Sequence, residues 1–267
     1  MSEIGVYARQ TWALTKRELK HWYRSKMQIF MALIQPLIWL GLFGFAMSGF
    51  VNTSMTGVDY FSFLSIGMIV MTALTTAMTS GMSLIWDRRF GFLDKLRATP
   101  IPRSIIPLAR VLSTTIKSIV QTMIVFVIAL VLGLHLGSNF DVVSILVMLA
   151  VVICVSMTFS SIFVAMGLVI KSQEVLMGLN MLLNLPLMMA SGIMFPTSAF
   201  PNWLKAIANV NPLTYAADAI RRVTINVPDT MISLPQLMVS QDVLIIVVVA
   251  IIVTLLGMVF ARKGTKG

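Results

Sequence analysis

Long apolar runs occupy most of this 267-residue chain. A helix that crosses a bilayer needs about 17 to 25 predominantly apolar residues. Each such run must be helical in lipid, because a helix satisfies its own backbone hydrogen-bonding groups. We therefore predict an all-α polytopic membrane protein in which residues 1–267 form a single transmembrane domain with six transmembrane helices. Their approximate ranges are residues 27–49, 61–84, 105–134, 142–170, 175–194 and 243–261.

The composition agrees with this class and excludes others. Hydrophobic residues make up 58% of the chain and charged residues only 11%, whereas soluble domains carry about 25% charged residues. The net charge of +10 does not indicate nucleic acid, because the basic residues flank the apolar runs, where they mark topology. We expect membrane lipid as a partner and no nucleic acid. With Cys154 as the single cysteine, we expect neither an internal disulfide nor a metal site.

The distribution of Lys and Arg predicts the orientation. Fifteen of the 20 lie before the first run, in the second and fourth connections and in the tail, and three lie in the fifth connection. Because cytoplasmic segments carry the excess of Lys and Arg, we expect a multi-pass protein of the plasma membrane with both termini in the cytoplasm. The first run is too long for the apolar part of a secretory signal, so we expect it to stay attached.

The segment before the first run, residues 1–26, has the pattern of an amphipathic helix. Aromatic and leucine residues recur at helical spacings, and basic residues mark another face. Such a helix lies in the membrane interface with Trp and Tyr at headgroup depth. We predict a cytoplasmic interface helix that serves as an anchor and is compatible with docking a partner. Its candidate residues are Trp12, Lys16, Arg17, Lys20, Trp22 and Arg24.

The second connection, residues 85–104, holds a short apolar face made by Phe92, Leu93 and Leu96 between charged residues. Pro100 disfavours a helical Thr99. We therefore predict a short cytoplasmic helix that begins near Arg89 and ends at Thr99. Large apolar side chains in water cost free energy unless something covers them. We therefore favour a protein-docking helix over a solvated loop that only marks topology.

The fifth connection, residues 195–240, is too apolar for a free loop and too polar to span. Pro201 and Pro212 suit first helical positions, so we predict two short helices that dip into the outer leaflet and return. Asp218 can pair with Arg221 or Arg222 at helical spacing. Two interpretations of this segment remain: a structural lid over the bundle and a gate for the substrate. The candidate gate residues are Pro196, Trp203, Tyr215, Asp218 and Arg221.

Polar residues inside the predicted spans are candidates for a translocation path. Arg110, Thr114, Lys117 and Gln121 follow the spacing of one helical face, and this stripe can attract an anionic or amphipathic cargo. Two alternatives are hydrogen bonds between helices and snorkelling of the Lys117 side chain to the inner interface. The candidate path residues are Thr72, Thr76, Thr79, Lys117, Gln121, Asn180 and Asn184.

No catalytic residues are expected. The sequence has no Gly-x-x-x-x-Gly-Lys-Ser/Thr loop, so the chain is not expected to bind ATP by that route. His21 and His135 fall on opposite sides of the predicted membrane, and no His-Glu-x-x-His pattern is present. We therefore expect no cofactor on this chain.

Three segments together resemble the type-2 ABC transporter permease family: the basic interface helix, residues 89–100 and residues 211–222. Within it they are most similar to the daunorubicin-resistance type of drug exporter, with lipo-oligosaccharide exporters next. The resemblance implies a homodimer, or a dimer with a sister permease, bound to two copies of a separate ATPase that holds ATP and Mg. It also implies a re-entrant extracellular helical pair at residues 196–222. The implied coupling helix, which contacts the ATPase, comprises Arg88, Arg89, Phe90, Gly91, Phe92, Leu93, Asp94, Lys95, Leu96 and Arg97.

The function that follows from the resemblance is ATP-driven export of a hydrophobic or amphipathic compound such as a drug, as in antibiotic resistance by multidrug efflux. An alternative is export of a lipid-linked glycan or oligosaccharide by the same machinery. A channel or carrier that works without ATP would be expected to carry acidic residues within its spans or two related halves. The sequence shows neither feature.

Overall fold

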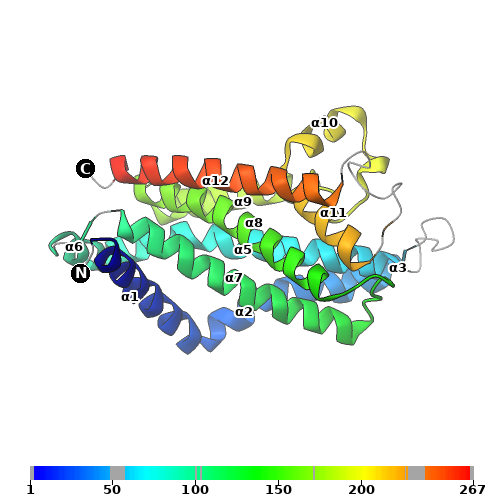
Figure 1. Cartoon of the computed structure of the whole chain (residues 1–267), viewed down its shortest axis with the longest axis horizontal. Helices are drawn as coiled ribbons and strands as arrows, with labels where there is room; N and C mark the ends of the chain where they lie inside the picture. The colour runs from blue at the N-terminus through cyan, green and yellow to red at the C-terminus, as the bar shows by residue number, and fades with distance from the viewer. Residues whose placement is uncertain are drawn as a thin grey trace.

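The computed structural model describes residues 3–48, 58–99, 101–102, 104–170, 172–225, 227 and 238–264. All regular structure in these residues is helical, which confirms the predicted all-α class. The long helices form an elongated bundle (Figure 1). At one end, called here the terminal end, α1 begins, α6 lies and α12 ends; α3 marks the opposite, distal end. The long and medium helices are α1 (Glu3–Arg24), α2 (Lys26–Ile38), α5 (Tyr60–Arg89), α7 (Ile105–Leu132), α8 (Val142–Val169), α9 (Gln173–Met189), α11 (Pro212–Thr224) and α12 (Val239–Gly264).

Shorter elements complete the described chain. α2 passes through a π-helical segment, η1 (Trp39–Gly44), into α3 (Phe45–Ser48). Pro36 lies inside α2 just before η1, and a proline removes a backbone donor and disturbs the helical hydrogen-bond ladder there. The remaining short elements are α6 (Phe92–Arg97), the 3₁₀ turn η2 (Thr197–Ala199) and α10 (Asn202–Val210).

Five helical segments are long and apolar enough to cross a membrane: Lys26–Ser48, Tyr60–Arg89, Ile105–Leu132, Val142–Val169 and Val239–Gly257. They match five of the six predicted spans. The remaining one, predicted over residues 175–194, corresponds to α9, which has 17 residues and ends at Met189. A helix of this length measures about 25 Å, less than the hydrocarbon core of about 30 Å. The sixth crossing therefore stays a prediction.

α9 ends five residues before the predicted limit because the chain turns there. Pro186 lies in its last turn. Gly192 has a φ of 68°, a left-handed conformation that glycine adopts without a steric penalty. Ile193 and Met194 beyond the turn are buried, so this apolar stretch packs against the protein rather than extending the helix.

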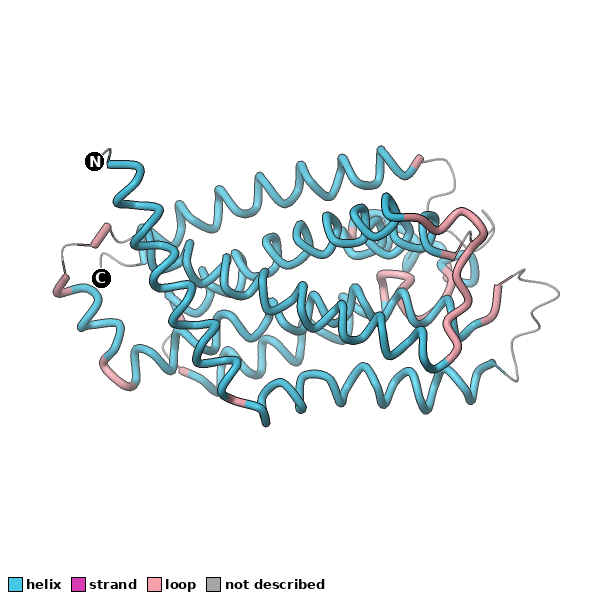
Figure 2. The backbone as a smooth tube through the Cα atoms, turned by 60° about the horizontal axis from the view of Figure 1, so that its bottom comes forward, coloured by secondary structure: helices cyan, strands magenta, loops and turns pink. Residues whose placement is uncertain are grey.

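α5 is the central helix of the bundle. In its most apolar stretch 94% of the residues are buried, against 17–44% in the other four candidate spans. It packs against α7 and α8, and Figure 2 shows the long helices running alongside one another with the loops gathered at their ends. A Cβ atom added to Gly81 would lie 2.2 Å from the carbonyl oxygen of Phe163, and one added to Gly167 would lie 2.4 Å from that of Gly81. These glycines let the α5 and α8 backbones touch.

α1 crosses α7 obliquely (Figure 1) and packs against it. The predicted helix is present, but its faces differ from the prediction. Thr11, Thr15 and Trp22 are buried, whereas Trp12 and Tyr23 are exposed. The aromatic residues therefore do not share one face, and the side of α1 that meets the protein is largely polar.

The second connection also differs from the prediction. α5 continues to Arg89, so Arg88 and Arg89 belong to α5 and not to a separate helix. A two-residue turn follows, in which Gly91 has a φ of 67°, and α6 then covers only six residues. The predicted start at Arg89 was wrong because α5 runs beyond its apolar stretch. Pro100 and Arg103 lie outside the described residues, as do the side chains of Asp94 and Arg97.

The fifth connection forms the two predicted short helices, α10 and α11, which lie toward the distal end (Figure 1). Pro212 occupies the first turn of α11, where the side-chain oxygen of Asn211 accepts a hydrogen bond of 3.1 Å from the Leu213 amide. Pro201 precedes α10 as its cap rather than standing in its first turn. Re-entry of this pair into a membrane stays a prediction, and residues 228–237 lie outside the described part.

Candidate functional site

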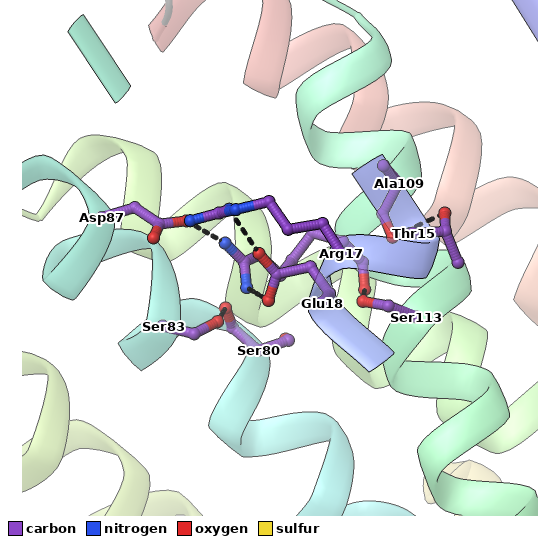
Figure 3. A network of polar contacts seen from close by, with 9 residues as sticks. Thr15, Arg17, Glu18, Ser80, Ser83, Asp87, Ala109 and Ser113 are labelled. Carbon is purple, nitrogen blue, oxygen red and sulfur yellow. Dashed lines mark hydrogen bonds and ion pairs between the residues drawn. The ribbon is translucent and has the colours of Figure 1, made fainter. Parts of the chain in front are cut away.

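Arg110 of α7 ties α1 to α5 at the terminal end. Its side chain is 6% exposed. It donates to Oε2 of Glu18 on α1 at 2.5 Å and to Oδ2 of Asp87 on α5. Arg17 pairs with the other Glu18 oxygen at 3.1 Å. Figure 3 shows Arg17, Glu18 and Asp87 converging between the three helices. Two arginines and two carboxylates carry no net formal charge, so this cluster, the Arg110 network, is internally neutralised.

α6 is fixed to the bundle by its apolar side chains. Leu93 is 1% exposed and packs with Leu84, Ile106 and Leu168, and Leu96 packs against the same cluster. The guanidinium of Arg17 lies 3.4 Å from the centroid of the Phe92 ring, a favourable cation–π arrangement. Leu93 is therefore covered by this chain itself, whereas Phe92 and Leu96 are half-buried, and the docking role of this helix stays a prediction.

The surface that α6 and the preceding turn expose is formed mainly by other residues than the predicted Phe92, Leu93 and Leu96. Phe90 is 72% exposed, and its ring stacks on that of Trp86 with centroids 5.7 Å apart. Lys95 and Arg89 are also exposed. Arg88 instead donates to the carbonyl oxygen of Leu168 at 2.7 Å, which links α5 to the end of α8.

The basic residues predicted for an interface helix lie together on α1. They line a shallow groove of about 700 Å³. Trp12 stands exposed away from this groove, and Trp22 faces the bundle. The basic residues that line the groove are Lys16, Arg17, Lys20, His21 and Arg24.

A cleft of about 590 Å³, called here the central cleft, lies between α2, α5, α7 and α9. It gathers predicted path residues from three helices that are far apart in the sequence. Thr72 is the exception: it is buried, and its hydroxyl donates to the carbonyl oxygen of Met68 at 2.7 Å. Thr114 and Trp22 also line the cleft. The path residues that line it are Thr76, Thr79, Lys117, Gln121, Asn180 and Asn184.

The polar groups of the central cleft divide into satisfied and unsatisfied ones. Thr76 donates to Gln121 Oε1, which joins α5 to α7 as the packing alternative predicts. Asn180 donates to the carbonyl oxygen of Met78 at 3.4 Å, but its own Oδ1 is buried without a hydrogen-bond partner. Lys117 forms no hydrogen bond or ion pair with any residue that the structure describes. Among the described residues, the cleft is thus lined by one cation without an ion-pair partner, Lys117.

A second polar centre lies under the distal end. Arg221 of α11 is fully buried and donates to the carbonyl oxygens of Gly192 at 2.9 Å, Ile193 at 2.8 Å and Phe63 at 3.3 Å. Its guanidinium also lies 3.5 Å from the centroid of the Phe63 ring. Asp218 is 3.9 Å away, which confirms the predicted pair. Burial lowers the pKa of Arg221 to about 10, which leaves the guanidinium charged at neutral pH.

The five predicted gate residues do not share one environment. Asp218 and Arg221 are buried in the bundle, whereas Trp203 on α10 is exposed. Tyr215 donates to the carbonyl oxygen of Asn209 at 2.7 Å, which ties α11 to α10. Pro196 precedes the η2 turn. Asp218 and Arg221 therefore hold the protein together rather than line an opening.

The family model described as ABC-2 type transporter matches residues 9–225. This range includes the Arg110 network, α6, the central cleft and α11. The chain belongs to the ABC-2 type transporter family. It is therefore a multi-pass membrane protein and an ABC transporter permease subunit, a transport component rather than an enzyme.

The similarity to known proteins covers most of the permease. It is 34% identical to a protein of Porphyra purpurea named as the transport permease ycf38, over 80% of this chain and 73% of that protein. It is 26% identical to the daunorubicin resistance ABC transporter permease protein DrrB1 of Streptomyces coeruleorubidus, over 76% and 73%. It is 21% identical to a protein of Mycobacterium tuberculosis named for doxorubicin resistance, DrrC, over 81% and 77%.

Three acidic residues of the permease that take part in ion pairs were not predicted from the sequence. Glu18 and Asp87 complete the Arg110 network, and Asp242, fully buried at the start of α12, lies 3.6 Å from Arg222. The signal that could have found them is the scarcity of acids. The chain has only 10 Asp and Glu, and a buried arginine near a membrane requires a partner.

Proposed function

We propose that this permease is the transmembrane subunit of an ATP-driven exporter that moves an amphipathic compound, such as a drug, out of the cell. It works as a homodimer, or with a sister permease, together with two copies of a separate ATPase that holds ATP and Mg. The observation that carries the proposal is the central cleft, which collects polar residues of three predicted spans around a free lysine.

The size and position of the central cleft suit a cargo. Sites for small molecules usually measure about 300 to 1,000 Å³, and this one measures about 590 Å³. Lys117 lies 12 residues after the start of α7, which is about 18 Å along the helix axis. The side chain therefore starts well inside the bundle, between the Arg110 network and the distal end.

The terminal end suits an ATPase. The charge distribution of the sequence favours a cytoplasmic location for this end. α6 follows α5 after a turn of two residues, and its Leu93 packs on side chains from α5, α7 and α8. A push on α6 would therefore move helices that line the central cleft. The exposed Phe90 and Lys95 are the groups on this surface that we assign to the ATPase contact.

Transport in proteoliposomes tests the function. The permease and the ABC ATPase that co-purifies with it are reconstituted, and release of a dansyl-labelled eleven-carbon amphiphile is followed. We expect release that requires ATP and stops when the phosphate-loop lysine of the ATPase is changed to alanine. Release that follows a proton or sodium gradient without ATP would contradict the proposal.

The ATPase contact is tested with Phe90→Ser. A well-packed aromatic anchor at an interface is commonly worth 2 kcal/mol or more, so we expect ATPase affinity to fall by at least about tenfold, which corresponds to about 1.4 kcal/mol. Phe45→Ser is the matched control, because Phe45 is 52% exposed and stacks on Phe61 with centroids 5.0 Å apart, but at the distal end. Equal ATPase affinity in both variants would remove this assignment.

A further inference from the structure

We propose that the central cleft takes an amphiphile with an anionic head group, and that Lys117 binds this group. The inference rests on the proposed function, because it names the class of cargo for the same site. It is argued from the charge balance of the cleft and of the network beneath it.

Lys117 is the only charged residue among those that line the central cleft in the described part of the chain. The charged groups whose fields reach it are Glu18, Arg110 and Asp87. Both of these carboxylates bond to Arg110, and Arg17 neutralises the remaining charge of the cluster. The network therefore supplies no unpaired carboxylate for Lys117, and among the described residues its ammonium has no ion-pair partner.

An anion is the partner that this environment favours. A cation held away from bulk water is costly unless it is paired, so an anionic head group would relieve that cost, whereas a cationic one would add repulsion. Snorkelling alone does not account for the arrangement, because Lys117 faces a cleft shared with Thr76, Gln121 and Asn180 rather than lipid alone.

The remaining lining fits the rest of an amphiphile. Met31, Met78, Met177 and Met181 line the central cleft, and methionine side chains adapt to irregular apolar shapes such as a hydrocarbon tail. Head group and tail thus each have a complementary part of the same cleft.

The test uses two probes that differ only in the charge of the head group. Both carry a dansyl label on an eleven-carbon chain, one ending in sulfonate and the other in trimethylammonium, so that neither charge depends on pH. Binding to the full-length permease complex, purified in a neutral detergent without nucleotide, is followed by dansyl fluorescence. We expect the sulfonate to bind at least tenfold more tightly than the trimethylammonium compound.

Variants then assign the preference to Lys117. Lys117→Gln should reduce sulfonate affinity about tenfold without reducing binding of the trimethylammonium probe, and Lys117→Arg should retain the preference. Lys26→Gln is the matched control, because Lys26 is an exposed lysine at the start of α2 that does not line the central cleft. Thermal unfolding of each variant checks that the fold is kept. Equal affinity for the two probes, or an unchanged preference in Lys117→Gln, would overturn the inference.

This binding assay separates the two proposals. A preference for sulfonate without any ATP-dependent release in proteoliposomes would support the anion site and overturn the export function. ATP-dependent release without a charge preference would support the export function and overturn the anion site.

Discussion

Replacing Arg221 with methionine tests whether the distal polar centre holds the fold together. Methionine keeps much of the side-chain volume but removes the three hydrogen bonds to carbonyl oxygens and the cation beside Asp218. Breaking a buried ion pair by removing one partner costs about 3 to 5 kcal/mol. In a chain of this size each kcal/mol lowers the unfolding midpoint by about 2 to 4 °C. We therefore expect Arg221→Met to lower the midpoint by about 6 to 20 °C.

The assay is thermal unfolding of the purified permease in detergent, followed by intrinsic fluorescence. Arg221→Lys should fall between the wild type and Arg221→Met, because an ammonium keeps the charge but lacks the planar fork that reaches several carbonyls at once. Arg9→Met is the control, since Arg9 is an exposed arginine of α1, and it should shift the midpoint by less than about 2 °C. A shift in Arg221→Met no larger than that of Arg9→Met would refute the reasoning.

Two further substitutions test the packing of the helices. Gly81→Ala should lower the unfolding midpoint because its Cβ would meet the Phe163 carbonyl oxygen at 2.2 Å, whereas Gly178→Ala, in a helix with open space around it, should raise it slightly. An equal effect of both would contradict the backbone contact. Glu18→Gln should cost about 1.5 to 3 kcal/mol, the range for a hydrogen bond to a charged group, and should speed hydrogen exchange in α1, with the exposed Glu174→Gln as control; unchanged exchange would contradict the role of Glu18.

The helical framework could be predicted because apolar length is a local property of the sequence. Five predicted spans correspond to candidate spans of the structure, and α10 and α11 follow their prolines closely. The polar residues of the central cleft could be predicted for a similar reason. Lys117 and Gln121 share one face of α7 by spacing alone, and this face did meet polar residues of α5 and α9.

What failed depended on contacts between distant segments. The sequence predicts that a partner protein covers Leu93 of α6, but Leu84, Ile106 and Leu168 come from three other places in the chain to cover it. The inward face of α1 was missed for the same reason. Glu18 and Arg110 are 92 residues apart, and no local pattern relates them. Aromatic residues suggested a lipid-facing side, whereas pairing with Arg110 decided which side meets the protein.

α2 and α9 each carry a proline inside the helix, and α5 does not. It contains no proline over its 30 residues, so it is an uninterrupted rod of about 45 Å. The first span, in contrast, changes to π-helix after Pro36, and α9 carries Pro186 near its end. A displacement applied beside Arg89 would therefore be expected to reach Tyr60, while bending would be expected first in α2 and α9, at their prolines. The central cleft is thus lined by one continuous helix, α5, and by two helices that contain a proline, α2 and α9.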